Sequence, residues 1–451
     1  MASSFNQIFR GAAGSGETTP TVEDLFSTYL YEGTGATPTI TNGIDLAGEG
    51  GLVWIKNRDA TDSNVLTDTV RGATKILYSD TTAAEETDTD TITSFTSTGF
   101  VLGADDKVNT SAESYVAWTF RKAPNFFDIV SYTGTGSTQN ISHNLGSVPA
   151  VIMIKDLASG SRWSVYHKDA SPTGNPENGR MALNTTDQWY ETPGISSFAN
   201  LWNQTAPTDS VFTVGSYNDT NVDGGNFIAY LFAHETGDDS RIKCGTFDTD
   251  GSGDATIDLG WEPQWVLNKV TSAADNWTIA DSIRGFSAVG DQRLYGNLNN
   301  VEAVATTYLT NSTGYIVNSG ETSKTLVYIA IRAPMMATIT DATEVFAVDD
   351  RNGSTPEFTS GFPVDFALIK DTDNSSSDWE VNTRLLGATK LITNDTDAEA
   401  SDSDAKFDLM NGHKGGGDAG EYSWMWKRAK GYFDVVAYTG TGSARTVAHG
   451  L

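Results

Sequence analysis

The chain has 451 residues, 58 of them acidic and 29 basic, which gives a formal net charge of −29. This acidity excludes nucleic acids and anionic lipid heads as partners, because their phosphates would be repelled. A single cysteine, Cys244, rules out an internal disulfide and a cysteine zinc site, and no apolar run approaches the roughly 20 residues that span a bilayer.

Residues 1–24 lie outside the repeats described below and are predicted to form an N-terminal arm. The arm carries Phe5, Ile8, Phe9 and Arg10, followed by a flexible stretch rich in glycine and alanine. Apolar side chains on such an arm favour an anchor peptide that becomes ordered when it docks on a partner. The alternative is a disordered leader.

A helix is predicted over residues 22–29, at the end of the arm. Thr21 is a suitable N-cap, and Asp24 stands three residues further on, as in a capping box. A strand leading into Tyr31 is the competing interpretation.

A turn signature then recurs along the chain. Tyr132-Thr-Gly-Thr-Gly-Ser137 returns as Tyr438-Thr-Gly-Thr-Gly-Ser443, and weaker copies begin at Tyr31, Phe247 and Val348. The five anchors are about 102 residues apart on average. Self-similarity at a fixed period indicates repeated structural units.

Two further signatures follow each anchor in the same order. The first is an apolar run that ends in lysine: Gly51–Lys56, Ala150–Lys155, Gln264–Lys269 and Asp365–Lys370. The second is an aromatic strand that closes each unit: Tyr115–Lys122, Phe227–His234, Leu326–Arg332 and Tyr422–Arg428. Between them, units one, three and four share a motif that reads Arg71-Gly-Ala-Thr-Lys75, Arg284-Gly-Phe286 and Leu386-Gly-Ala-Thr-Lys390.

Short β-branched or aromatic runs between Thr/Gly/Ser turns predict an all-β fold of tandem β-sandwich domains, each of about 100 residues. Units of this size can bury their own cores, so we expect independent beads. The predicted boundaries are an arm at 1–24, repeats at 25–124, 125–238 (with an insertion at 167–210), 239–336 and 337–430, and the first hairpin of a fifth repeat at 431–451. A lone hairpin cannot bury an apolar face, so we expect the natural chain to continue past Leu451.

These motifs together resemble the repeated β-domains of tail-fibre and other appendage proteins of marine tailed bacteriophages. The resemblance rests on the Tyr-Thr-Gly-Thr-Gly hairpin, Gly51–Arg58, Arg71–Lys75 and Trp118–Pro124, and it covers residues 25–451. It implies a virion structural protein with a role in host attachment, and it carries no catalytic residues. Unit two departs from the pattern because it lacks the Arg-Gly-Ala-Thr-Lys motif.

Six tryptophans recur in register and are predicted to be core: Trp118, Trp163, Trp265, Trp277, Trp379 and Trp424. Trp189, Tyr190 and Trp202 instead fall in the insertion of unit two. Aromatic rings on a protruding loop would suit contact with a glycan or receptor. The competing interpretation is a packed loop that closes the end of the unit.

The sequence shows no catalytic constellation, and we expect no enzyme activity and no cofactor. The five histidines have unrelated spacings, and Asp248–Asp254 imitates a calcium loop without its final glutamate, so an acidic hairpin turn is favoured over a metal site. A polysaccharide depolymerase is kept as an alternative, because 58 acids allow many carboxylate pairs.

The sequence therefore favours a phage tail fibre or similar appendage, made in the host cytoplasm and located in the virion. Its expected partners are tail or other virion proteins through the arm, sister subunits in a homo-oligomer with a trimer left open, and a host surface glycan or receptor, without membrane insertion. A baseplate, collar or head-decoration protein is the nearest alternative.

Overall fold

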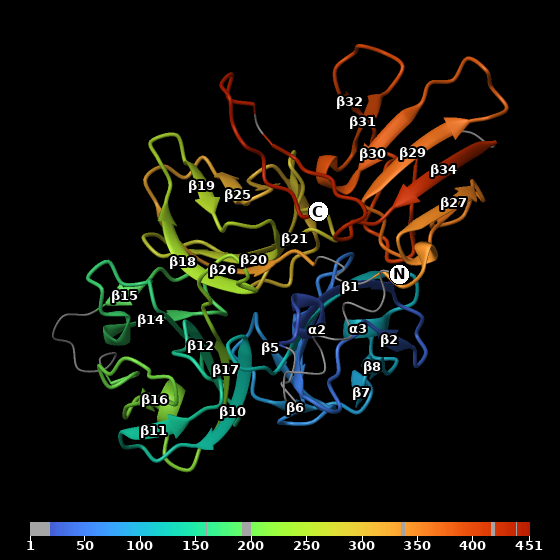
Figure 1. Ribbon diagram of the computed structural model, residues 1–451. Helices are drawn as coiled ribbons and strands as arrows, with labels where there is room; N and C mark the ends of the chain where they lie inside the picture. Colours follow the sequence, from blue (N-terminus) through green and yellow to red (C-terminus); the bar gives the residue numbers. More distant parts are fainter. Residues whose placement is uncertain (1–18, 159, 192–199, 335–338, 416–419, 439) are drawn as a thin grey trace, which may run out of the picture.

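The computed structural model describes residues 19–158, 160–191, 200–334, 339–415, 420–438 and 440–451. The fold is all-β, as predicted, and is organised as four β-sandwiches that we call beads 1 to 4 (Figure 1). The predicted anchor residues Phe5, Ile8, Phe9 and Arg10 lie outside the described residues.

Bead 1 contains a six-stranded antiparallel sheet in the order β1-β9-β3-β4-β5-β6 and a smaller sheet β2-β8-β7. Its elements are α2 (Val22–Leu25), β1 (Phe26–Glu32), β2 (Thr39–Thr41), β3 (Gly51–Asn57), β4 (Val65–Asp68), β5 (Lys75–Tyr78), β6 (Glu86–Thr87), β7 (Ile92–Thr96), β8 (Gly99–Leu102), α3 (Asp106–Asn109) and β9 (Ser114–Arg121). Both interpretations of residues 22–29 are partly right: Thr21 and Asp24 form a capping box for one helical turn, and the chain enters strand β1 at Phe26.

Bead 2 repeats this order as β10-β17-β12-β13-β14-β15, with a two-stranded sheet β11-β16. Its elements are β10 (Phe127–Thr133), β11 (Gln139–Ser142), β12 (Val151–Asp156), β13 (Ser164–His167), η1 (Pro176–Asn178), β14 (Gly179–Ala182), β15 (Tyr190–Glu191), β16 (Val211–Val214), α4 (Asn218–Asn221) and β17 (Asn226–Phe232). Strands β14 and β15 fall inside the predicted insertion, so part of that segment belongs to the common sheet.

Beads 3 and 4 have the same main sheet, ordered β18-β26-β20-β21-β22-β23 and β27-β34-β29-β30-β31-β32, with small sheets β19-β25-β24 and β28-β33. Bead 3 comprises β18 (Ile242–Asp248), β19 (Asp254–Asp258), β20 (Pro263–Val270), β21 (Trp277–Asp281), β22 (Asp291–Tyr295), β23 (Ala303–Ala305), β24 (Tyr308–Asn311), β25 (Gly314–Asn318) and β26 (Thr325–Arg332). Bead 4 comprises η2 (Ala342–Glu344), β27 (Phe346–Asp350), β28 (Phe358–Thr359), β29 (Phe366–Asp371), β30 (Glu380–Thr383), η3 (Arg384–Leu386), β31 (Thr389–Ile392), β32 (Ala400–Ser401), β33 (Gly412–His413) and β34 (Glu421–Trp426).

Beads 1 and 3 each bury a core of their own, as predicted, but beads 1, 2 and 3 are not independent, because they also share a further core. One face of each main sheet packs on the bead's own small sheet. The opposite face enters a single hydrophobic core that draws residues from all three beads. Phe120 of bead 1, for example, has ring contacts with Phe127 and Phe232 of bead 2 and with Trp265 of bead 3, at centroid distances of 5.5–5.6 Å.

The three beads close into a ring through one hydrogen bond repeated around a pseudo-threefold axis. Trp163 of bead 2 donates from Nε1 to the carbonyl of Tyr78 in bead 1, at 2.8 Å. Trp277 of bead 3 donates in the same way to Ala182 of bead 2, at 2.9 Å. Asn64 has the equivalent position in bead 1 and donates to Tyr295 of bead 3, at 3.2 Å. In each bead the acceptor is the last residue of the strand that stands fifth in the order of the main sheet. The three contacts are therefore equivalent.

A second contact is also repeated between the beads. It joins the end of the strand that stands fourth in the main sheet of one bead to the last strand, along the chain, of the next bead. Tyr230 donates to Asp68 Oδ2 at 2.8 Å, Trp118 donates to Asp281 Oδ2 at 3.0 Å, and His167 Nε2 lies 3.2 Å from the carbonyl of Tyr328. The shared Arg-Gly motif belongs to this contact, because Arg71 and Arg284 pair with Asp68 and Asp281 at 2.5 and 2.6 Å. Its role in the structure is therefore to satisfy buried carboxylates at the bead interfaces.

His167 replaces the aspartate in bead 2 and makes the ring sensitive to acid. Burial lowers its pKa to about 4, and both ring nitrogens are used: Nδ1 accepts from Asp169 N–H and Nε2 faces Tyr328 O. Between pH 6.5 and 4 the unfolded chain therefore binds a proton here that the native chain does not. Stability is expected to fall as the pH is lowered through this window, by up to about 1.4 kcal/mol per pH unit.

Urea unfolding of the native chain and of His167→Gln from pH 7 to pH 4 measures this effect. The stability of the variant relative to the native chain is expected to rise as the pH falls. Parallel pH profiles for the two proteins would contradict the assignment.

Candidate functional site

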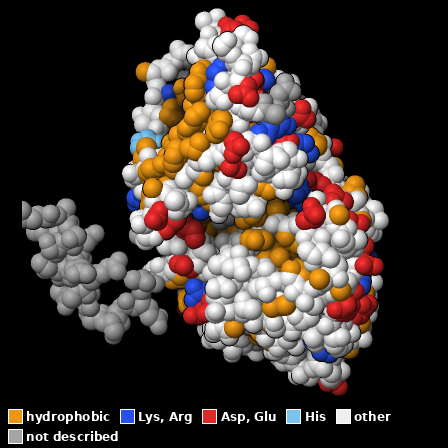
Figure 2. All heavy atoms as spheres, turned by 90° about the vertical axis from the view of Figure 1, so that its right-hand side faces the viewer, with side chains coloured by type: hydrophobic (Ala, Val, Ile, Leu, Met, Phe, Trp, Pro, Cys, Tyr) orange, Lys and Arg blue, Asp and Glu red, His pale blue; other side chains and the backbone are white. Residues whose placement is uncertain are grey.

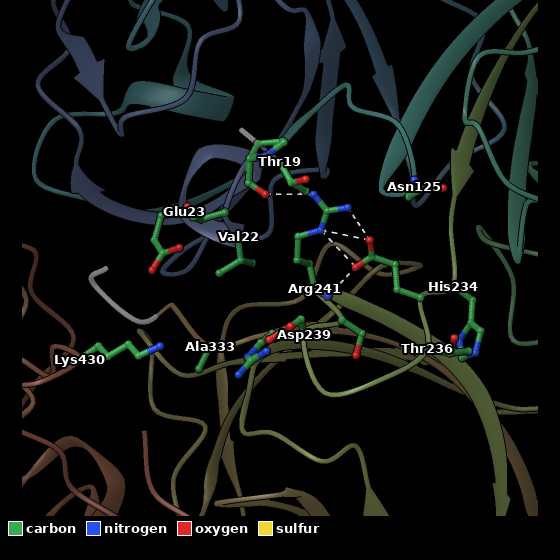
Figure 3. Close-up of a pocket in the computed structure, with 15 residues that line it drawn as sticks. Thr19, Val22, Glu23, Asn125, His234, Thr236, Asp239, Arg241, Ala333 and Lys430 are labelled. Carbon is green, nitrogen blue, oxygen red and sulfur yellow. Dashed lines mark hydrogen bonds and ion pairs between the residues drawn. The ribbon is translucent and has the colours of Figure 1, made fainter. Parts of the chain in front are cut away.

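The connections between the beads converge on one cavity of about 600 Å³ at a pole of the ring (Figure 3). The cavity is lined by residues 19–23, where bead 1 begins, and by residues from each later connection: Asn125, 234–236, 239–241, 332–333 and Lys430. Thr19, the first of the described residues, lies at the rim of this cavity. The cavity is a candidate site because both the arm and all the connections meet there.

Arg241 lines this cavity and links the start of bead 1 to the connection between beads 2 and 3. Its guanidinium donates to the carboxylate of Glu235 and, through Nη1, to the carbonyl of Pro20 at 3.0 Å. The carboxylate neutralises the cation, and the bond to Pro20 fixes the root of the arm against the connection between beads 2 and 3. Lys430 and Glu23 line the opposite side of the cavity from His234 (Figure 3). The site thus offers charged groups of both signs around the described end of the arm.

Of the three aromatic residues predicted to contact a glycan, two are buried beside Gly179 and one is exposed. Trp189 and Trp202 are only 6% and 2% exposed, and Trp202 donates from Nε1 to the carbonyl of Gly179 at 3.2 Å. The prediction that these two rings are available for stacking is therefore wrong. Tyr190, in contrast, is 49% exposed. Adjacent residues of an extended chain point to opposite sides, which explains why Trp189 is buried while Tyr190 is not.

Tyr190 lines a second cavity, of about 450 Å³, which is formed by bead 2 and by Ala274 of bead 3. Arg162 and Asp187 form an ion pair at its wall, 2.9 Å apart and both well exposed, and Arg180 and Gln188 complete the polar lining. Burial, followed by the charge of Arg162, lowers the pKa of the Arg180 guanidinium. An aromatic ring beside guanidinium, carboxylate and amide groups has the chemistry of a sugar-binding surface.

The remaining titratable groups singled out by sequence have structural roles. Asp250 accepts hydrogen bonds from the backbone N–H groups of Asp254 and Ser252, which lower its pKa, so the calcium-like segment is the turn between β18 and β19. Within the described part of the chain, no group of three or more His, Cys, Asp or Glu side chains is placed to hold a metal ion. Burial raises the pKa of the Cys244 thiol, which donates to the carbonyl of Ala233.

The chain belongs to a family described as a domain of unknown function, DUF7483, whose sequence profile matches residues 21–332. This span runs from the capping box to the end of β26 and therefore covers the closed ring of beads 1 to 3. No curated protein matches the chain. Each helix among the described residues has at most four residues, and none is long and apolar enough to cross a membrane.

Proposed function

We propose that the chain is a structural protein of a phage appendage, which holds its binding surfaces on a rigid ring and attaches through its N-terminal arm. The closed ring of beads 1 to 3 is the observation that carries this proposal. Three sandwiches that share one core and are joined by buried hydrogen bonds form a stiff body, as an appendage under mechanical force requires. The phage assignment itself is supported by the sequence resemblance.

The proposal that the arm is an anchor is supported by the contacts that hold its described end at the cavity between the bead connections. Arg241 donates to Glu235 and to the carbonyl of Pro20, so the described end of the arm is held at one point among the connections between the beads. An arm with Phe5, Ile8 and Phe9 could then dock on a tail or collar protein while the ring stays folded. A baseplate, collar or head-decoration role uses the same arm and differs only in where it docks.

Antibody-gold labelling of intact particles of the encoding phage tests the location. Label on a tail appendage is expected, and it should disappear when residues 2–16 are deleted while the ring melts at an unchanged temperature. Label confined to the head would favour the decoration role. Absence of the protein from purified particles would refute a virion function altogether.

Host contact is proposed at the Tyr190 cavity. The Tyr190→Ala variant is expected to bind host cells or their surface glycan roughly five- to thirtyfold more weakly, because a stacked sugar ring contributes on the order of 1–2 kcal/mol. Its melting temperature should stay within a degree or two of the native value, since Tyr190 is half exposed.

Val148→Ala serves as a control, because Val148 is an exposed residue of bead 2 with a similar exposed fraction and does not line this cavity. It should leave glycan binding unaltered. Equal binding by the native chain and by Tyr190→Ala would show that the glycan is not recognised at this cavity. Release of reducing sugars from the host polysaccharide would instead support the depolymerase alternative.

A further inference from the structure

The Tyr190 cavity differs in charge from the rest of the molecule. Among the described residues, its charged lining consists of Arg162, Arg180 and Asp187, so two guanidiniums face one carboxylate. The whole chain has a formal net charge of −29, and Asp and Glu side chains are scattered over the whole face that Figure 2 shows. A cavity with an excess of positive charge on such an acidic chain attracts anions that the rest of the surface repels.

Arg162 keeps most of its hydrogen-bonding capacity for a ligand. Its guanidinium makes one hydrogen bond with a described residue, from Nη1 to Asp187 Oδ2 at 2.9 Å, whereas a guanidinium can donate five. The side chains of Arg162 and Asp187 are 41% and 53% exposed, so water screens their ion pair and the pair is weak. A ligand carboxylate can therefore bind Arg162 without a large loss of existing contacts.

Arg180 and Tyr190 are held beside each other by the sheet. They stand directly opposite in the antiparallel pair of β14 and β15, so their side chains leave the same face. Arg180 is paired with Asp219 of α4 at 3.7 Å, and burial, followed by the charge of Arg162, lowers the pKa of its guanidinium. An anion bound by both guanidiniums would relieve the repulsion between them.

Bead 3 holds the segment that carries Tyr190 in place. The backbone N–H of Trp189 donates to the carbonyl of Thr271 at 2.9 Å. Lys269 donates from Nζ to the carbonyl of Thr186 at 3.0 Å. The closed ring therefore positions Tyr190 before any ligand binds, which lowers the entropic cost of binding.

The common fold does not account for Tyr190 or Arg162. At the position of Tyr190, opposite the counterpart of Arg180, the other beads have a small or acidic residue: Glu86, Ala303 and Ala400. Arg162 directly precedes Trp163, and the residues that precede the counterparts of Trp163 are not basic: Ser63, Asn276 and Asp378. Both residues are thus particular to bead 2, as expected of a binding surface and not of the shared scaffold.

Exposure of an aromatic ring does not by itself mark such a site. Trp379 of bead 4 stands at the strand position of Trp163 and Trp277, and it is 36% exposed. The prediction that it is a core residue like the other repeated tryptophans is therefore wrong. Tyr190 differs from Trp379 because its ring lines a cavity together with two guanidiniums.

A third cavity, of about 460 Å³, lies on the other side of the ion pair between Arg180 and Asp219. Arg180 lines the Tyr190 cavity and Asp219 lines the third one, so the pair stands between the two. The third cavity is lined by amide, hydroxyl and carboxylate side chains: Asn200, Ser216, Tyr217, Asn218 and Asp219. Such groups form hydrogen bonds with sugar hydroxyls, so a glycan of more than one residue can extend from one cavity into the other.

We propose that the Tyr190 cavity binds an acidic glycan, with Arg162 and Arg180 on a sugar carboxylate and Tyr190 stacked on the sugar ring. A guanidinium matches a carboxylate with two parallel N–H···O bonds, which a neutral sugar cannot reproduce. Hexuronates and sialic acids share this carboxylate chemistry. The inference rests on the glycan contact proposed above and adds the class of glycan.

Titration calorimetry of the 451-residue chain tests the proposal with tetragalacturonate and with tetrasialic acid, each also in a carboxyl-reduced form. At least one acidic probe is expected to bind about tenfold or more tightly than its reduced form. Arg162→Gln should weaken the binding of that acidic probe by about tenfold and leave the reduced form unaffected. Lys107→Gln is the matched control: Lys107 is 35% exposed and paired with Asp105 at 3.1 Å in bead 1, and its loss should not change binding.

Asp187→Asn supplies a test of opposite sign. The substitution removes the carboxylate that competes for Arg162, so the acidic probe is expected to bind about threefold more tightly or better, with no change for the reduced form. A purely structural role of this ion pair would not produce a gain in affinity. Because both side chains are well exposed, the melting temperatures of the Arg162→Gln and Asp187→Asn variants should stay within a degree or two of the native value.

Four results would overturn the proposal: no binding of either acidic probe, equal binding of the acidic and reduced forms, an Arg162→Gln variant that binds the acidic probe like the native chain, or weaker binding by Asp187→Asn. If Tyr190→Ala nevertheless weakens binding to host cells, the proposed glycan contact holds and only the class of glycan is wrong. If the acidic probes bind as expected but Tyr190→Ala leaves host-cell binding intact, the cavity is an acidic-glycan site that is not the point of host contact.

Discussion

Replacing Trp277 with alanine is expected to destabilise the ring by about 3–5 kcal/mol, the cost of removing a large buried aromatic side chain. Trp277 is 2% exposed, lies in the core shared by beads 1 to 3, and donates to the carbonyl of Ala182 in the next bead. Because the residue joins two beads, the loss should lower the unfolding transition of all three beads together. Guanidinium unfolding followed by circular dichroism and by tryptophan fluorescence measures the change.

Trp379→Ala is the matched control, because Trp379 stands at the same strand position in bead 4. It is expected to change the stability of the ring by less than about 0.5 kcal/mol, because Trp379 does not belong to the core shared by beads 1 to 3. Equal losses in the two variants would show that the tryptophan is needed inside every bead and not between beads. A loss below about 1 kcal/mol for Trp277→Ala would contradict its place in a shared core.

Replacing Asp281 with alanine should cost a similar amount, about 3–5 kcal/mol, for an electrostatic reason. Asp281 is fully buried, accepts the indole N–H of Trp118 from bead 1, and pairs with Arg284 at 2.6 Å. The variant would leave one buried guanidinium without that counter-ion and one buried indole without an acceptor. Equilibrium unfolding in urea at neutral pH gives the difference.

A surface ion pair of the same bead supplies the control for Asp281→Ala. Glu321 lies 3.9 Å from Lys324 and is 59% exposed, so Glu321→Ala should change stability by no more than about 1 kcal/mol. An Asp281→Ala variant as stable as Glu321→Ala would mean that the bead interfaces do not depend on their buried carboxylates.

The repeated elements could be predicted from the sequence because they are local. Thr/Gly/Ser turns and apolar strands that end in lysine are set by neighbouring residues, and all four beads contain them. The Arg-Gly motif was also visible in the sequence, but its pairing with Asp68 and Asp281 and the contacts of these aspartates with other beads were not. Trp118 and Asp281 are 163 residues apart, and nothing near either residue indicates the other.

The ring itself could not be predicted, because an apolar strand has the same sequence pattern whether one face or both faces of its sheet are covered by other beads. Strand β3 is buried at each of its residues, while the equally apolar β29 is buried only at alternate ones. The difference arises from which beads close the ring, not from the strands. At the candidate glycan site, the sequence could not show which way each side chain points. It grouped Trp189, Tyr190 and Trp202 in one segment, but only Tyr190 reaches the surface.

Hydrogen exchange followed by mass spectrometry tests most directly whether beads 1 to 3 form one cooperative body. The slowest amides of β9, β17 and β26, the closing strands of the three beads, are expected to exchange through one opening with the same free energy, within about 1 kcal/mol. Trp277→Ala should lower this value equally in all three strands. Distinct opening free energies for the three strands, or an effect of Trp277→Ala confined to β26, would show instead that the beads fold separately.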